Sequence, residues 1–291
     1  MTKLELIRGN VTLDISDEIS FQHEENSGFG MPPLHRINER GPLQHGVTDL
    51  GYRLDPRTVQ LVIPMLTTGW SDHFDRRATL LDVINPVYNQ VINLRFTLPD
   101  GSMRQLDCYA INGPFFTTRD QIAGGSNMRA GFSLYAPDPA WYDPTAQTIT
   151  LGQTGGGAAW LIPWAIPWTI GGSTLDDTYS LNYPGTWLAY PQIVITGPVT
   201  DPVVTNLQTG AKLDFTGITI SSGHYYSIDT RYGYKTVLLD GTTNKLADLT
   251  EDSDLVDWAI VPGPNPINAT GTAIDGNTRI NINYKNQFLG V

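Results

Sequence analysis

Apolar and polar residues alternate along much of this chain, with a period typical of half-buried β-strands. The first stretch, "LELIRGNVTLDIS", alternates on both sides of Gly9-Asn10, which predicts a hairpin. Strand-like stretches follow at "RTVQLVIPML", "VINLRFTL", "MRQLDCYAI" and "MRAGFSLYAPDPAWYDP". Segment 27–46 is crowded with Gly and Pro, and we expect it to be a long excursion with little regular structure.

One stretch has helical spacing instead. "WSDHFDRRATLLDVINP" predicts a helix with Ser71 as its N-cap and Pro86 as its end. Its expected apolar stripe, which should pack on a sheet, runs through Phe74, Ala78, Leu81 and Ile84 or Asn85, with Leu80 beside it.

The second half repeats a rhythm of strand, turn and strand, with turns at dipeptides such as Asp240-Gly241 and Asp275-Gly276. In "TAIDGNTRININYKN", apolar Ile280, Ile282 and Tyr284 alternate with polar neighbours. This is the pattern of an antiparallel strand with one wet face. It predicts a β-sandwich or jelly-roll domain.

The longest apolar run, "AAWLIPWAIPWTIGG", places Trp160, Trp164 and Trp168 four residues apart. A membrane-spanning helix needs about 20 apolar residues, and this run is shorter and interrupted by two prolines. No charged residue occurs between positions 144 and 175, so we interpret this stretch as a connection. The predicted organisation of the 291 residues is therefore mainly β: an N-terminal domain with one α-helix (1–150), a connection (151–180) and an antiparallel β-sandwich (181–291).

Charge and cysteine content narrow the class of partner. The formal net charge of −11 disfavours sequence-specific nucleic-acid binding and anionic membranes. A single cysteine, Cys108, excludes an internal disulfide, and the first residues lack the apolar core of a signal peptide. We expect synthesis in a reducing cytoplasm.

No phosphate-binding loop, metal-binding pair or nucleophile motif is present in the sequence. His35 and His45 share a loop but lack a nearby third ligand. Adjacent acids such as Asp176-Asp177 are expected by chance among 29 acidic residues, so a glycosidase is disfavoured. We therefore predict no catalytic residue, no metal and no cofactor.

Aromatic residues are the better candidates for binding, because sugar-binding sandwiches stack them on pyranose rings. The candidate glycan contacts are Trp187, His224, Tyr225, Tyr226 and Trp258. The alternative is that these aromatic side chains fill the sandwich core or cap its edges.

Seven stretches of the chain are distinctive in their order and spacing: "GMPPLHRINERGPLQHG", "GYRLDPRTVQLVIPM", "RRATLLDVINP", "YPQIVITGPVTDPVVTNLQTGAKLDF", "GHYYSIDTRYGYKTV", "LLDGTTN" and "VPGPNPI". Taken together, they resemble the distal tail proteins of long, non-contractile-tailed bacteriophages. The resemblance covers nearly the whole chain and rests on the order and spacing of these stretches.

The resemblance implies a structural protein of the virion tail tip, assembled in the bacterial cytoplasm. Its N-terminal domain would form a homo-hexameric ring that continues the tail tube, and a galectin-like C-terminal domain would project outward. Implied partners are the tail tube protein, the tail hub or tail-associated protein, a receptor-binding protein and the tape measure protein. The alternative function is a carbohydrate-binding module that attaches the virion to a host cell-wall glycan.

The resemblance also suggests residue roles. Candidate ring contacts, hypothesised from their arginine forks and their place in matching stretches, are Arg40, His45, Arg57, Arg76 and Arg77. For Arg57, an intramolecular ion pair that holds the loop is an equal alternative. Trp160, Trp164 and Trp168 become an interdomain joint, with a sugar platform or a contact to another tail protein as alternatives.

Overall fold

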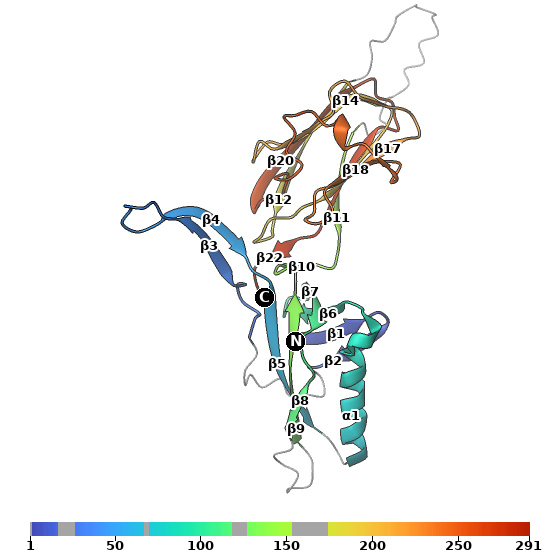
Figure 1. Ribbon diagram of the computed structural model, residues 1–291. Coiled ribbons are helices and arrows are strands. Elements are labelled where there is room, and N and C mark those ends of the chain that lie inside the picture. Colours follow the sequence, from blue (N-terminus) through green and yellow to red (C-terminus); the bar gives the residue numbers. More distant parts are fainter. Residues whose placement is uncertain (1, 17–26, 67–69, 118–126, 153–173) are drawn as a thin grey trace, which may run out of the picture. The chain divides into compact units, whose positions relative to one another are not determined.

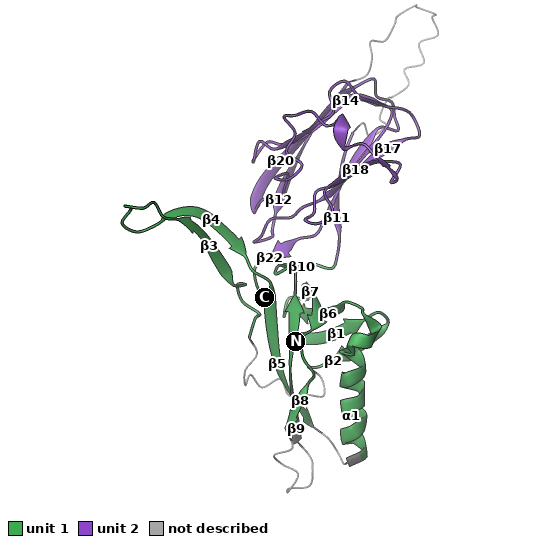
Figure 2. Ribbon diagram, viewed as in Figure 1, with its two compact units in different colours: residues 1–144, 288–291 green, residues 145–287 purple. Residues whose placement is uncertain are grey.

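The computed structural model describes residues 2–16, 27–66, 70–117, 127–152 and 174–291 (Figure 1). They form two compact units, coloured separately in Figure 2: unit 1 comprises Met1–Pro144 and Phe288–Val291, and unit 2 comprises Thr145–Gln287. Unit 1 thus ends a few residues before the expected boundary at 150. Unit 2 begins well before the expected start at 181 and includes the strand Leu175–Tyr183, most of which was assigned to the connection. The final residues of the chain return to unit 1.

The alternating stretches of unit 1 form a mainly antiparallel sheet, as the sequence predicts. The expected first hairpin is present, with Leu6 paired to Leu13. The strands of this sheet are β1 (Lys3–Arg8), β2 (Val11–Asp14), β5 (Arg57–Leu66), β6 (Ile92–Thr97), β7 (Met103–Ala110), β8 (Phe115–Thr117), β9 (Asn127–Ala136), β10 (Trp141–Tyr142) and β22 (Gln287–Phe288).

Helix α1 (Trp70–Val83) confirms the predicted helix, but most of the expected stripe faces away from the sheet. Phe74 and Leu81 are 57% and 42% exposed, whereas the buried side chains are Ile84, the last residue of that stripe, Leu80 beside it, and His73 and Val83. The helix carries two apolar stripes about one position apart, and tertiary packing buries the other one. The expected N-cap Ser71 lies inside the helix, and a 3-10 turn, η1 (Pro86–Tyr88), follows it.

Segment 27–46 contains a strand, contrary to the expectation of little regular structure. β3 (Leu34–Glu39) pairs with β4 (Thr48–Leu54) in a separate two-stranded sheet. The Gly- and Pro-rich letters "GPLQHG" form the turn at its tip. We call residues 34–54 the β3–β4 hairpin.

Unit 2 contains two antiparallel sheets, in agreement with the predicted β-sandwich. Their inward-facing residues share one apolar core that includes Ile193, Phe215, Trp258 and Ile282. The first sheet contains β11 (Gln147–Leu151), β13 (Gln192–Thr196), β17 (Tyr225–Asp229), β18 (Thr236–Leu239), β19 (Thr243–Asn244) and β21 (Arg279–Tyr284). The second contains β12 (Leu175–Tyr183), β14 (Val199–Asn206), β15 (Lys212–Asp214), β16 (Thr219–Ile220) and β20 (Gly263–Thr272), and a 3-10 turn, η3 (Leu246–Asp248), lies outside both sheets.

The chain crosses between the units twice, after Pro144 and after Gln287. Beyond the second crossing, the Phe288 side chain joins the core of unit 1. The Val291 amide donates to the Phe29 carbonyl at 3.1 Å. Unit 2 is therefore inserted into unit 1.

None of the helices in the described part of the chain has the length and hydropathy needed to cross a bilayer.

Candidate functional site

The β3–β4 hairpin exposes an unusual amount of apolar surface. Both strands are exposed or half-buried along their whole length. Two-stranded hairpins are marginally stable alone in water and normally gain stability from a covered apolar face. In the described residues, no third strand pairs with the hairpin. The exposed large apolar side chains are Leu34, Ile37, Leu43, Val47, Leu50 and Tyr52.

The tip of the hairpin is held in shape by its own hydrogen bonds. The Gln44 side chain accepts from the Gly41 amide at 3.0 Å and donates to the Thr48 hydroxyl at 2.8 Å. Arg40 donates to the Gln44 carbonyl at 3.3 Å. This arrangement leaves Leu43 95% exposed at the end of the hairpin.

Two of the five candidate ring contacts lie at this tip. Arg40 and His45 are both exposed there, so the structure brings them together. Among the described residues, Arg40 has no ion pair with a carboxylate, whereas Arg36 lower in the hairpin pairs with Asp49 at 2.9 Å. The Arg40 guanidinium is thus available to a neighbouring molecule.

Arg57 belongs to the interior of unit 1. Its side chain is 1% exposed. It donates to the carbonyls of Pro139 (2.8 Å), Gly28 (2.5 Å), Gly30 (2.5 Å) and Leu289 (2.7 Å). Burial lowers the pKa of Arg57 to about 10, which still leaves it charged at neutral pH. A side chain without exposed area cannot contact another subunit, so the ring-contact hypothesis is wrong for Arg57. Arg57 instead makes intramolecular contacts, as the alternative expected, but its partners are backbone carbonyls and not a carboxylate.

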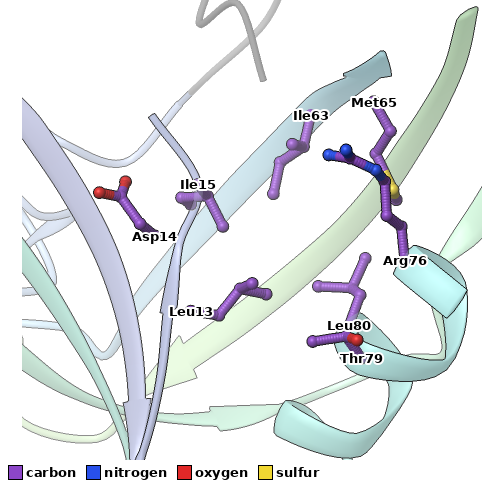
Figure 3. Close-up of a pocket in the computed structure, with 8 residues that line it drawn as sticks. All are labelled: Leu13, Asp14, Ile15, Ile63, Met65, Arg76, Thr79 and Leu80. Atoms are coloured by element: carbon purple, nitrogen blue, oxygen red, sulfur yellow. The ribbon is translucent and has the colours of Figure 1, made fainter. Parts of the chain in front are cut away.

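Arg76 and Arg77 lie on α1, away from the hairpin tip. Arg76 pairs with Asp72 at 2.9 Å, one turn earlier. It also lines a small, mostly apolar cavity of about 110 Å³ beside Met65 and Leu80 (Figure 3). The Arg77 guanidinium stacks 4.4 Å from the centre of the Phe116 ring. Both arginines therefore have partners within unit 1.

An apolar groove lies on unit 1 near the end of α1. Its volume is about 430 Å³. Leu81 and Ile111, which line it, are 42% and 55% exposed. The sequence suggested no such feature, although Leu81 belongs to the stripe that was expected to pack on the sheet. We call this recess the α1 groove; it is lined by Leu81, Ile84, Asn85, Pro86, Ala110, Ile111, Asn112, Gly113 and Pro114.

Two of the candidate glycan contacts in unit 2 are core residues. Trp258 is fully buried, and its indole nitrogen donates to the Val204 carbonyl at 3.2 Å. Tyr226 is 4% exposed, and its hydroxyl donates to Asp248 at 2.5 Å. Burial, together with that carboxylate, raises the pKa of Tyr226. The glycan-contact hypothesis is wrong for both, because neither ring face can reach a ligand.

The remaining three candidates do not form one site. His224 and Tyr225 are exposed where β17 begins, and His224 Nδ1 lies 2.7 Å from Asp240. Trp187 precedes β13, whose first residue pairs with Asp229 at the opposite end of β17. A strand of five residues therefore separates Trp187 from His224.

A different group of aromatic residues does gather on unit 2. The rings of Tyr190 and Tyr232 meet edge to face with centres 4.8 Å apart, and the Lys235 amine lies 4.9 and 4.7 Å from them. Next to them, Arg231 stacks 4.5 Å from the ring of Tyr234. Burial lowers the pKa of Lys235, and that amine also donates to the Val256 carbonyl. We call Tyr190, Tyr232 and Tyr234 the tyrosine patch.

The tyrosine patch combines exposure with rigidity. Tyr232 and Tyr234 are 66% and 61% exposed, yet each ring is held by a cation that is itself anchored. Arg231 pairs with Asp229 at 2.6 Å. The sequence signal that could have indicated this patch is "DTRYGYK", which places two tyrosines and two cations in one turn.

Other sequence expectations find no site in the structure. Trp160, Trp164 and Trp168 lie outside the described residues. Within the described ranges, no group of three or more His, Cys, Asp or Glu side chains is arranged to hold a metal ion. Cys108 is fully buried, and burial raises the pKa of its thiol. A thiol in this state is not a reactive nucleophile.

Comparison with known protein families gives a match for part of the chain. Residues 184–288 match the family described as "Siphovirus-type tail component, C-terminal domain". None of the curated proteins matches the chain in sequence.

Among solved structures, the fold is similar to that of SPP1 Dit, described as a paradigm of the hub adsorption apparatus in phages that infect Gram-positive bacteria. The TM-score is 0.64 at 12% identity, over 98% of this chain and 99% of that one. A chain of the phage p2 baseplate in its activated conformation is more distant, with a TM-score of 0.44 at 10% identity over 97% and 98% of the two chains. Residues 184–288 therefore match a siphovirus tail component family, and the fold of the chain is similar to that of SPP1 Dit; together these findings confirm the resemblance to distal tail proteins.

Proposed function

We propose that this protein assembles as a hexameric ring at the tip of a phage tail, where it joins the tail tube to the distal hub. The observation that carries the proposal is the β3–β4 hairpin, whose exposed apolar side chains need a cover that the described chain does not supply. A neighbouring subunit in a ring supplies it. The role is structural, with ring closure and docking in place of a catalytic step.

The same proposal gives unit 2 the role of a docking platform for adhesion components. The family match lies in unit 2, within residues 184–288. Partners of the ring would be the tail tube protein, the tail hub protein, the tape measure protein and a receptor-binding protein.

A ring at this position encloses a lumen through which DNA leaves the particle. Unit 1 carries 17 acidic and 12 basic residues, and unit 2 carries 12 acidic and 6 basic residues. Both units are therefore acidic, and a lumen lined by either one would repel phosphate groups. DNA would pass such a surface without sticking.

The ring is tested on the purified full-length chain by mass photometry and negative-stain electron microscopy. We expect particles of about 192 kDa, six times the 32.0 kDa subunit, with an open centre. Joining Leu34 to Leu54 through an Asn-Gly turn removes the hairpin, and we expect this variant to remain a folded monomer. Monomers of the unmodified chain at all concentrations, or rings of the hairpin-free variant, would contradict the proposal.

A second candidate function, attachment to a cell-wall glycan, is favoured by the tyrosine patch. Rigid exposed aromatic rings bind at low cost in conformational entropy. The Tyr232 and Tyr234 rings meet this condition, because stacked cations hold them. This site replaces the five residues suggested by the sequence.

Glycan attachment is tested by the retention of the full chain on purified cell-wall polysaccharide. We expect Tyr232→Ala to weaken retention by about tenfold, because it removes the most exposed ring of the patch. Tyr179→Ala is the matched control, since Tyr179 is 45% exposed on β12, outside the patch. Equal retention of the two variants would rule out the tyrosine patch as the glycan site.

A further inference from the structure

Unit 1 exposes apolar side chains in two places, the α1 groove and the β3–β4 hairpin. The groove offers about 430 Å³ between the end of α1 and residues 110–114. An engineered apolar cavity of about 150 Å³ is enough to hold one benzene ring, so the groove has room for about two large apolar side chains. Its exposed lining is continuous with further apolar surface at Val87, which is 84% exposed on η1.

The hairpin does not fill the groove of its own chain. Figure 1 shows β3 and β4 standing away from α1, and the two-stranded sheet pairs only with itself in the described residues. Its tip presents Leu43 with almost all of its surface exposed. One unit therefore carries a projecting apolar part and a separate apolar recess.

Charge favours another copy of this chain as the occupant. The hairpin, residues 34–54, carries three arginines against Glu39 and Asp49, a net charge of +1. The rest of unit 1 carries 9 basic and 15 acidic residues, a net charge of −6. Asp82, which follows Leu81, is 46% exposed but already pairs with Arg8 at 3.0 Å, so the charge argument rests on the two net charges. A hairpin of net positive charge is attracted to a unit that is otherwise acidic.

We propose that the hairpin of one subunit lies in the α1 groove of the next, with Leu43 against Leu81 and Ile111. The contact is head-to-tail, because the projecting part and the recess are different surfaces of unit 1. Head-to-tail contacts generate closed rings when the rotation between neighbours closes. The inference rests on the proposed hexameric ring and names the surfaces that close it. It also gives the outward-facing Leu81 of α1 a partner.

Cysteine pairing tests the contact directly. Leu43→Cys and Ile111→Cys are made in separate full-length chains, and the buried Cys108 remains as it is. After the two proteins are mixed and oxidised, we expect a disulfide-linked dimer that is absent when either variant is oxidised alone. Equal yields of dimer in the mixture and in the single variants, or no dimer from mixed rings, would overturn the contact.

Charge insertion supplies a second, independent test. We expect Leu43→Asp and Ile111→Asp each to raise the concentration needed for half-assembly by at least about tenfold. Leu207→Asp is the control, because Leu207 is equally exposed (55%) but lies in unit 2. The hairpin and groove substitutions both replace exposed side chains, so hydrogen exchange should show a folded unit 1.

These experiments distinguish the proposed ring from the proposed contact between hairpin and groove. If the unmodified chain forms rings and both charged variants form them equally well, the hairpin and groove contact is wrong and the ring proposal stands. If the unmodified chain forms no ring, the proposed ring fails and the contact fails with it.

Discussion

Replacing Arg57 by methionine is expected to destabilise unit 1 by about 3–5 kcal/mol. The guanidinium gathers the carbonyls of Gly28, Gly30, Pro139 and Leu289, which come from three separate parts of the chain. Methionine fills a similar volume but donates no hydrogen bond. The loss therefore reflects buried carbonyl groups deprived of their donor.

The measurement is calorimetric unfolding of the full chain, with hydrogen exchange to assign each transition to its unit. We expect the transition of unit 1 to fall by roughly 10–15 °C and that of unit 2 to stay in place. Arg57→Lys should recover part of the loss, because an ammonium group keeps the charge but cannot span four acceptors. Arg53→Met is the matched control, since the Arg53 side chain is 65% exposed on β4. If the Arg57 and Arg53 variants unfold at the same temperature, the guanidinium is not a structural centre.

The behaviour of Arg57 shows where sequence patterns stop being informative. In "LDPRTVQ", Arg57 stands at the start of a strand, and a charged residue at such a position is normally exposed. Its burial results from the approach of three backbone segments that are distant in sequence. At Gly28, one of these acceptors, an added Cβ would collide with the Thr58 carbonyl, so the segments lie in close contact. No local pattern records such a convergence.

The strands with one buried face were predictable, because burial on one side imposes a period of two. β1 and β21 show this alternation in both sequence and structure. The β3–β4 hairpin was not predicted, because its strands lack a buried face. In the described part of the chain both of its strands are exposed or half-buried, so burial does not select apolar residues at every second position. The Gly and Pro residues of its turn were the stronger sequence signal.

Helix α1 illustrates an ambiguity of a different kind. Its existence and approximate bounds followed from spacing, but its sequence carries two apolar stripes. Sequence alone does not decide which of two apolar stripes packs against the sheet. The same limit applies to the aromatic residues of unit 2, where residue type does not separate buried Trp258 from exposed Tyr232.

The sequence predicts consecutive domains, whereas unit 1 contains residues from both ends of the chain. Alternation and turn signals indicate where strands occur, but not which sheet receives them. The short β22 is adjacent in sequence to the strands of unit 2, yet its Phe288 side chain belongs to the core of unit 1. Two chain crossings therefore connect the inserted unit to unit 1.

Replacing Phe288 by alanine tests the second of these connections, and we expect unit 1 to lose about 3 kcal/mol of stability. The Phe288 ring is 9% exposed within the core of unit 1. The Arg104 guanidinium stacks 3.4 Å from its centre, and burial lowers the pKa of Arg104. The substitution removes both the apolar contact and the stacked cation.

Removal of residues 288–291 should cost more than Phe288→Ala, because it also takes away the Leu289 carbonyl that accepts from Arg57 and the Val291 amide that donates to Phe29. Val291→Ala is the control within the same segment, since its side chain is 39% exposed and its backbone bond is kept. Hydrogen exchange should report faster exchange in β5 and β10 of unit 1 and unchanged exchange in β13 and β20 of unit 2. If the truncated chain unfolds like the control, the return of the chain is a passive tail, and the second crossing does not anchor the inserted unit.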